Sequence, residues 1–281
     1  MLSMRASYDR QTIFSRMPEL VNFDDIELLA TKTVAIPGAG GVGFTHAESL
    51  VRMGVGRVKI SDFDRFGPEN VSRQFGATFD TIGRKKVDVL GERLQSINPA
   101  LAIEASEGID ERSIGTFLDG VDIVCDALDF FAVEARRMLH REARKRRIPL
   151  VMTGPSAFGA TLQVFDNSGM SLDEYFDLHD HQSEEENKAN FAIGINPARL
   201  SRHYHRAPDL GVGRRGAVST GCLLATSMTG AATLRRLLGQ SDFFKPVPYV
   251  YAIDLVMGQF VEMHVPGGVK AIKANPAAYA R

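Results

Sequence analysis

The sequence contains no tryptophan and only two cysteines, Cys125 and Cys222. Two cysteines cannot supply the four thiolates of an all-cysteine zinc site or the bridges of a disulfide framework, so both classes are excluded. No apolar run is long enough for a transmembrane helix, and the N-terminus lacks the apolar core of a signal peptide. We therefore expect a soluble, cytoplasmic protein with no membrane partner.

The chain also lacks an excess of either charge. It has 33 Lys and Arg against 34 Asp and Glu, a formal net charge of −1. This balance argues against a bulk electrostatic grip on nucleic acid, although it leaves a local basic patch possible. The 281 residues are 44% hydrophobic, which is enough for one large α/β domain or two small ones.

A glycine-rich turn follows the first apolar run, 34–37, and precedes a helix-compatible segment, 42–53. Its glycines are Gly38, Gly40, Gly41 and Gly43. In nucleotide-binding folds such a turn lets the backbone approach a phosphate, which then faces the helix N-terminus. Glycine turns also serve as plain structural corners, so this motif alone leaves both interpretations open. An acid at the end of the next apolar run, about 20 residues on, favours the nucleotide-binding interpretation, because such an acid accepts hydrogen bonds from ribose hydroxyls.

Acidic, amide and basic side chains follow in one stretch of sequence. They are Asp62, Asp64, Asn70, Arg73, Gln74 and Lys86. Cations around the phosphates suit a site that cleaves a triphosphate, because Arg and Lys offset charge that develops on the transferring group. A hydride-transfer site has no use for them, so an NAD(P)-dependent oxidoreductase is the weaker reading.

These motifs together resemble the ubiquitin-activating (E1-like) superfamily, in its ThiF/MoeB/HesA branch of adenylyltransferases. The matching elements are GAGGVG at 38–43, DFD at 62–64, N-x-x-R-Q at 70–74, Lys86 and the acidic strand end Cys125-Asp-Ala-Leu-Asp129. The resemblance extends over about residues 7 to 265. It implies an ATP- and Mg²⁺-dependent attack of a carboxylate on the α-phosphate, which yields an acyl-adenylate and pyrophosphate.

The resemblance also implies site roles. Gly38, Gly40, Gly41 and Gly43 line the nucleotide with Asp64, Gln74, Asp126 and Leu128. Asp62 takes the ribose, and Asn70, Arg73 and Lys86 take the phosphates. Asp129 holds Mg²⁺, and Arg10 reaches the pyrophosphate end of a partner subunit's nucleotide in a homodimer. From the residues alone, Arg10 reads instead as a solvated side chain and Asp129 as a helix N-cap. Phe130 replaces the asparagine of relatives, and their nearby arginine is displaced to Arg136.

The cysteines that this chain lacks reduce the number of candidate reactions. Relatives with a structural zinc carry two C-x-x-C pairs, and thioester-forming relatives carry a cysteine in the crossover loop; this chain has neither. Cys125 and Cys222 read as inert buried thiols. Adenylation of a protein C-terminus, a peptide or a small carboxylate remains open. So do a tRNA threonylcarbamoyladenosine dehydratase, with tRNA as its partner, and an inactive nucleotide-binding partner subunit.

The apolar pattern predicts a single α/β domain with a doubly wound, mostly parallel sheet and ligands at the carboxyl ends of the strands. We divide it into an N-terminal helical arm (1–33), a nucleotide-binding core (34–165), a crossover loop (166–216), a C-terminal helix and antiparallel hairpin (217–265) and a tail (266–281). The crossover loop shows no regular pattern, and its His179, His181, His203 and His205 read as solvent-facing rather than metal-binding. The basic helix 133–144 reads as a solvated face.

Overall fold

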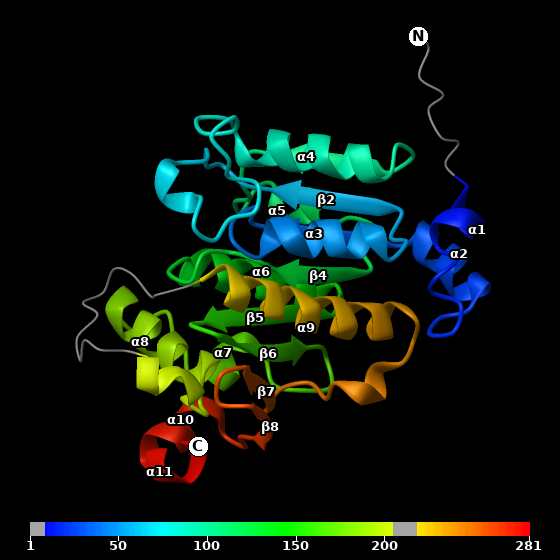
Figure 1. The fold of residues 1–281 in the computed structure, drawn as a ribbon. Helices are drawn as coiled ribbons and strands as arrows, with labels where there is room; N and C mark the ends of the chain where they lie inside the picture. The colour runs from blue at the N-terminus through cyan, green and yellow to red at the C-terminus, as the bar shows by residue number, and fades with distance from the viewer. Residues whose placement is uncertain (1–8, 205–217) are drawn as a thin grey trace.

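The computed structural model describes residues 9–204 and 218–281, and its centre is an eight-stranded sheet in the order β3-β2-β1-β4-β5-β6-β7-β8 (Figure 1). The strands are β1 (Thr33–Pro37), β2 (Arg57–Ser61), β3 (Ala102–Ser106), β4 (Ile123–Asp126), β5 (Leu150–Ser156), β6 (Gly159–Phe165), β7 (Tyr249–Asp254) and β8 (Gln259–His264). The pairs among β1 to β5 are parallel, whereas β6, β7 and β8 pair antiparallel. The predicted doubly wound sheet with an antiparallel extension is therefore confirmed.

Helices cover both faces of the sheet, as a central parallel sheet requires. One apolar cluster joins β1 and β2 to α3 (Gly43–Arg52), α4 (Lys86–Ile97) and α9 (Ser219–Leu237), which lie in front of the sheet in Figure 1. A second cluster joins β4, β5 and β7 to α5 (Ile114–Phe117) and α6 (Val133–Lys145) behind it. The switch in strand order between β1 and β4 leaves the carboxyl ends of these strands as the expected ligand edge.

The N-terminal arm packs at the amino ends of the strands, away from that edge (Figure 1). It contains α1 (Arg10–Ile13) and α2 (Phe23–Thr31). Asn22 is the N-cap of α2, and Asp25 reciprocates in a capping box. The acids of the first turn, Asp24 and Asp25, also favour the helix start through the helix dipole.

The described part of the predicted crossover loop contains regular structure, so the expectation of an irregular segment is wrong for 166–204. It forms α7 (Leu172–Phe176), α8 (Glu184–Ile195) and the 3₁₀ helix η2 (Leu200–Tyr204). Capping boxes start α7 at Ser171 and α8 at Ser183. The buried face of α8 includes two polar residues, Asn187 and Asn190. They interrupt the helical spacing of apolar residues, so the sequence pattern did not indicate a helix. We call 166–204 the insert.

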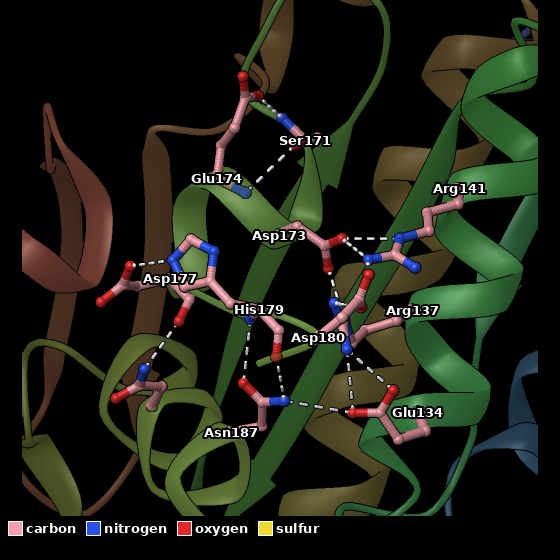
Figure 2. A network of polar contacts seen from close by, with 11 residues as sticks. Glu134, Arg137, Arg141, Ser171, Asp173, Glu174, Asp177, His179, Asp180 and Asn187 are labelled. Carbon is pink, nitrogen blue, oxygen red and sulfur yellow. Dashed lines mark hydrogen bonds and ion pairs between the residues drawn. The ribbon is translucent and has the colours of Figure 1, made fainter. Parts of the chain in front are cut away.

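The prediction that the arginines of α6 form a solvated face is wrong for Arg136 and Arg137, although Arg141 remains 48% exposed. Arg136 and Arg137 are buried. Arg137 bonds Glu134 (2.9 Å), Asp173 (3.0 Å) and Asp180 (2.6 Å), so α6 holds α7 and the 177–183 turn of the insert (Figure 2). These contacts make the arginines part of the packing between α6 and the insert.

The predicted tail is helical and folds back onto the insert. It comprises α10 (Gly268–Ala274) and α11 (Pro276–Tyr279), and Val269 and Ile272 of α10 are buried. Gly268 has φ +58°, and a Cβ there would lie 2.1 Å from the Tyr175 carbonyl oxygen, so the close approach requires glycine. The remaining short helices are η1 (Pro68–Asn70) and η3 (Ser241–Phe243). Among the described residues no helix is long and apolar enough to cross a membrane.

Candidate functional site

The glycine turn between β1 and α3 is closely surrounded by backbone. Gly38 has φ +98°, and a Cβ at this position would lie 2.1 Å from the carbonyl oxygen of Ala127. A Cβ on Gly43 would lie 1.8 Å from the Gly38 carbonyl oxygen. These two positions tolerate no side chain, and the turn delivers α3 with its N-terminus at the carboxyl edge of the sheet.

Asp62 joins the glycine turn to the loop that follows β2. One carboxylate oxygen accepts the backbone N–H of Ala39 at 2.7 Å, and the other accepts the N–H of Asp64 at 2.8 Å. The acid that sequence spacing assigned to the ribose therefore lies against the glycine turn. Its contact with a ribose stays a prediction.

The loop 62–85 lies at the same edge, next to the glycine turn. Asn70 is buried and accepts the N–H of Gly67 at 3.0 Å, which closes the turn around η1. Arg73 is half-buried and donates to the Glu69 carbonyl oxygen at 3.1 Å. The amide of buried Gln74 lies beside Gly40, with Nε2 3.7 Å from the position of a Cβ there. Asn70 and Gln74 thus shape the loop against the turn.

Lys86 opens α4 and turns its ammonium toward the same loop. Its Nζ lies 2.9 Å from Asp64 Oδ2, and its side chain is 7% exposed against 51% for Asp64. The backbone of the two residues is also joined, since Lys86 N–H donates to the Asp64 carbonyl oxygen at 3.0 Å. A mostly buried cation whose partner is half-exposed suits exchange of that carboxylate for an anionic ligand.

The turn after β4, residues 126–129, carries the remaining predicted ligands. Asp126 is buried, and its Oδ2 bonds Arg136 (2.8 Å) and His140 (3.0 Å). Burial alone would raise the pKa of Asp126, but Arg136 and His140 outweigh it and hold that pKa at about 2. Its carboxylate is thus committed within the protein, so any role toward a nucleotide passes through the turn itself.

Asp129 is exposed at the carboxyl edge, and its Oδ1 accepts the N–H of Phe131 at 2.9 Å. It is not the helix N-cap, because Ala132 occupies that position of α6. No group of three His, Cys, Asp or Glu side chains able to hold a metal occurs in the part of the chain that the structure describes. One exposed carboxylate nevertheless fits Mg²⁺, which proteins commonly bind through one or two carboxylates together with nucleotide phosphates and water.

Arg10 lies apart from this assembly within the chain. Its guanidinium donates to the carbonyl oxygens of Ile26 (2.6 Å) and Gly54 (3.3 Å), and it pairs with Glu27 at 3.0 Å. Gly54 follows α3, so Arg10 is at the opposite end of that helix from the glycine turn. The structure therefore brings together every predicted site residue except Arg10, whose role across a dimer stays a prediction.

Both cysteines are buried, as predicted. Burial raises the pKa of the Cys125 thiol to about 12 and that of Cys222 to about 11. The sequence did not reveal that Cys222 adjoins the site: its Sγ lies 3.3 Å from where a Cβ on Gly41 would be. No local pattern signals this contact, because it joins α9 to a turn about 180 residues earlier in the chain.

The loop histidines make local contacts. His179 pairs with Asp177 at 2.8 Å, and its ring stacks on His181 at 5.0 Å. His205 lies outside the described residues, and the side chain of His203 is not described.

Curated relatives align with the chain over part of their length. The tRNA threonylcarbamoyladenosine dehydratase of Bacillus subtilis is 39% identical over 140 residues, which cover 49% of this chain and 54% of the relative. The molybdopterin-synthase adenylyltransferase of Haemophilus influenzae is 30% identical over 159 residues, covering 56% and 63%. The chain therefore spans less than two thirds of the length of these relatives.

Solved structures share the fold at low identity. PaaA gives a TM-score of 0.67 at 18% identity and covers 94% of this chain and 76% of its own. The E. coli tRNA N6-threonylcarbamoyladenosine dehydratase TcdA in complex with ATP gives 0.59 at 20% identity, covering 82% and 96%. The ThiF family matches residues 8–268, which is nearly the whole sequence and includes every residue of the site described above. The chain belongs to the ThiF family.

Proposed function

We propose that the protein binds Mg²⁺ and ATP at the carboxyl edge of β1, β2 and β4, and transfers the adenylyl group to a carboxylate with release of pyrophosphate. The main support is the contact of Asp62 with Ala39, which joins the glycine turn to the loop carrying Arg73. Family membership and the adenylyltransferase activity named for a relative support the reaction type. The ATP complex of a structure with the same fold supports the nucleotide.

The proposed reaction brings two anions together, a carboxylate and the α-phosphate. Arg73 and Lys86 would offset their repulsion, because preorganised cations are worth more in a partly dry site than in water. Lys86 is already held by Asp64, so binding of the phosphates would share or replace that partner. Bound Mg²⁺ would neutralise phosphate charge, and Asp129 is the residue that would hold it.

The oxygen that attacks phosphorus belongs to the substrate carboxylate, and the bond to pyrophosphate breaks as the acyl-phosphate bond forms. A nucleophile then displaces AMP from the acyl-adenylate. We propose no thioester on this protein, because both cysteines are buried and their pKa values are raised.

A second candidate function follows from the 39% identity with a tRNA threonylcarbamoyladenosine dehydratase. In that case the carboxylate belongs to the modified nucleoside, and a nucleophile within the same side chain displaces AMP with net loss of one water. A net charge of −1 gives no bulk attraction to tRNA, so this candidate requires a local basic surface.

Two measurements test these proposals. Calorimetric titration with ATP and Mg²⁺ should show binding to the wild-type protein. The protein is then incubated with ATP and one of two substrates: tRNA that carries threonylcarbamoyladenosine, or a small carrier protein ending in Gly-Gly. AMP release and mass spectrometry monitor the reaction. A mass decrease of one water in the nucleoside identifies the dehydratase. ATP binding without AMP formation from any carboxylate would instead identify a nucleotide-binding partner subunit.

A further inference from the structure

The turn 126–129 lies between the glycine turn and the insert. On one side, the Ala127 carbonyl oxygen approaches Gly38 so closely that a Cβ there would be 2.1 Å away. Ala127 N–H also donates to the Pro37 carbonyl oxygen at 3.1 Å. The position of this turn is thus tied to β1 and to the start of α3.

Arg136 holds the other side of the turn. Its Nε bonds Asp126 Oδ2 at 2.8 Å, and one terminal nitrogen donates to the carbonyl oxygens of Leu128 (2.7 Å) and Asp129 (3.3 Å). The guanidinium therefore contacts both ends of the turn that presents the Asp129 carboxylate. Its side chain is only 4% exposed, so these bonds are shielded from water.

The insert covers this guanidinium. The ring of Phe191, on α8, lies 4.6 Å from the Arg136 guanidinium carbon and packs edge-on against Phe130 at 5.3 Å. A buried cation over an aromatic face is attracted by the ring quadrupole. The other terminal nitrogen of Arg136 is buried with no hydrogen-bond partner among the described residues, so the ring and the bonds to the turn orient the group.

We propose that Arg136 is a positioning residue through which the seating of α8 controls how well the site binds Mg²⁺ with ATP. This inference rests on the proposed function. In this proposal Arg136 acts through the backbone of the turn that presents Asp129, to which its guanidinium is bonded, and not through a contact of its own with the ligand. Substrate bound against the insert would then tighten nucleotide binding, and bound nucleotide would tighten substrate binding by the same factor.

A purely structural role predicts something different. Removing one partner of a buried ion pair destabilises a fold whether or not a ligand is affected, so a loss of stability does not distinguish the two roles. The distinguishing quantity is the magnesium gain, which we define as the ratio of the ATP Kd in EDTA to the ATP Kd in Mg²⁺. It is measured by titration with ATP and needs no turnover.

The test compares Phe191→Leu and Arg136→Lys with Phe117→Leu. The control makes the same change in the same apolar cluster, but on α5 rather than on the insert. All variants are titrated at a temperature at which circular dichroism shows them folded. Phe191→Leu and Arg136→Lys should lower the magnesium gain about tenfold, as loss of outer-shell support for a metal ligand does. Phe117→Leu should leave it unchanged.

A double-mutant cycle with Asp129→Asn tests the route. If Phe191 acts through Asp129, Phe191→Leu should have no further effect on the magnesium gain in an Asp129→Asn background. Three outcomes would each overturn the inference. The magnesium gain could be unchanged in Phe191→Leu and Arg136→Lys, it could fall as much in Phe117→Leu as in these variants, or the effects in the cycle could be additive. Wild-type protein that binds no ATP would overturn the proposed function as well, which separates the two failures.

Discussion

The ammonium of Lys86 and the carboxylate of Asp64 form an ion pair at 2.9 Å, with the lysine side chain buried and the aspartate half-exposed. The pair joins the first residue of α4 to the loop after β2. It holds a cation at the edge where the glycine turn ends, and the exposed partner is the one that an incoming phosphate would displace. The lysine is the more buried of the two residues. A buried ammonium whose partner can be displaced is positioned to bind an incoming anion.

This arrangement predicts that Lys86→Ala and Arg73→Ala abolish substrate-dependent ATP–pyrophosphate exchange. Each change removes a cation that offsets charge in the transition state, and we expect a loss of about 10²-fold or more for each. Lys85→Ala is the matched control, because Lys85 is adjacent in sequence but pairs with Glu107 outside the proposed phosphate contacts. Exchange that persists in both site variants, or that falls equally in the control, would refute the assignment.

Much of this edge was predictable because its residues are close in sequence or end in neighbouring strands. The central strands β1 and β4 coincide with apolar runs, and Asp62, Asn70, Arg73 and Lys86 fall in one stretch of sequence. Parallel strand ends meet at one edge, so their approach follows from topology. The family match confirms the resemblance on which the roles rest.

The rest depends on contacts between distant segments. Burial of Arg136 and Arg137 could not be read from α6, since the partners that cover them, other than Glu134, lie on the turn 126–129 and the insert. A run of arginines on a helix has the same local pattern whether it faces solvent or acids from another segment. The insert itself carried a usable signal in its two Ser-x-x-Glu capping boxes.

A second prediction concerns subunit composition. If Arg10 serves the site of a partner subunit, mixing Arg10→Ala with Lys86→Ala chains should restore about a quarter of the activity. That is the share of intact sites when chains exchange freely between two-fold dimers. Within its own chain Arg10 bonds Ile26 and Gly54 at the far end of α3, where it cannot serve the local site. Mixed dimers confirmed by mass spectrometry but without activity would place each site within one chain.

A third prediction concerns stability in acid. His46 lies on the buried side of α3 and bonds Thr226 of α9 at 3.0 Å, and burial lowers its pKa to about 3. Between that pKa and the unfolded value of 6.5 the unfolded chain binds a proton that the folded chain does not. Stability from the neutral histidine is therefore complete above the unfolded pKa and falls as pH drops toward 3. We expect a loss of about 2 kcal/mol between pH 6.5 and 5 from this group.

Urea unfolding of the wild type and His46→Gln at pH 7 and pH 5 isolates this contribution. The variant is less stable at pH 7, but its stability should fall less between the two pH values, by about the same 2 kcal/mol. Burial also lowers the pKa of His140, which therefore contributes to the loss of stability in acid as well. This contribution is present in both proteins, so it cancels in the comparison. Equal losses of stability in the two proteins would contradict the assignment to His46.

The last prediction is that neither thiol carries an acyl group. The helix N-terminus beside Cys222 would favour a thiolate, and Arg73 also acts in that direction, but burial outweighs it and raises the pKa to about 11. The thiol at Cys125 is fully buried within β4 and bonds Thr233 at 3.3 Å. Cys125→Ser and Cys222→Ser should each retain adenylation and full turnover, with only the modest stability loss of a buried hydroxyl.

Intact mass spectrometry of the wild type during turnover tests this prediction, because a thioester adds the mass of the acyl group and is removed by hydroxylamine. Cys222 is the more demanding case, since its sulfur lies against Gly41 of the glycine turn. A change there that weakened only ATP binding would reflect packing, and saturating ATP would restore turnover. A hydroxylamine-sensitive adduct that disappears in Cys222→Ser together with turnover would instead show that this thiol accepts the acyl group, and would place the protein among the thioester-forming enzymes.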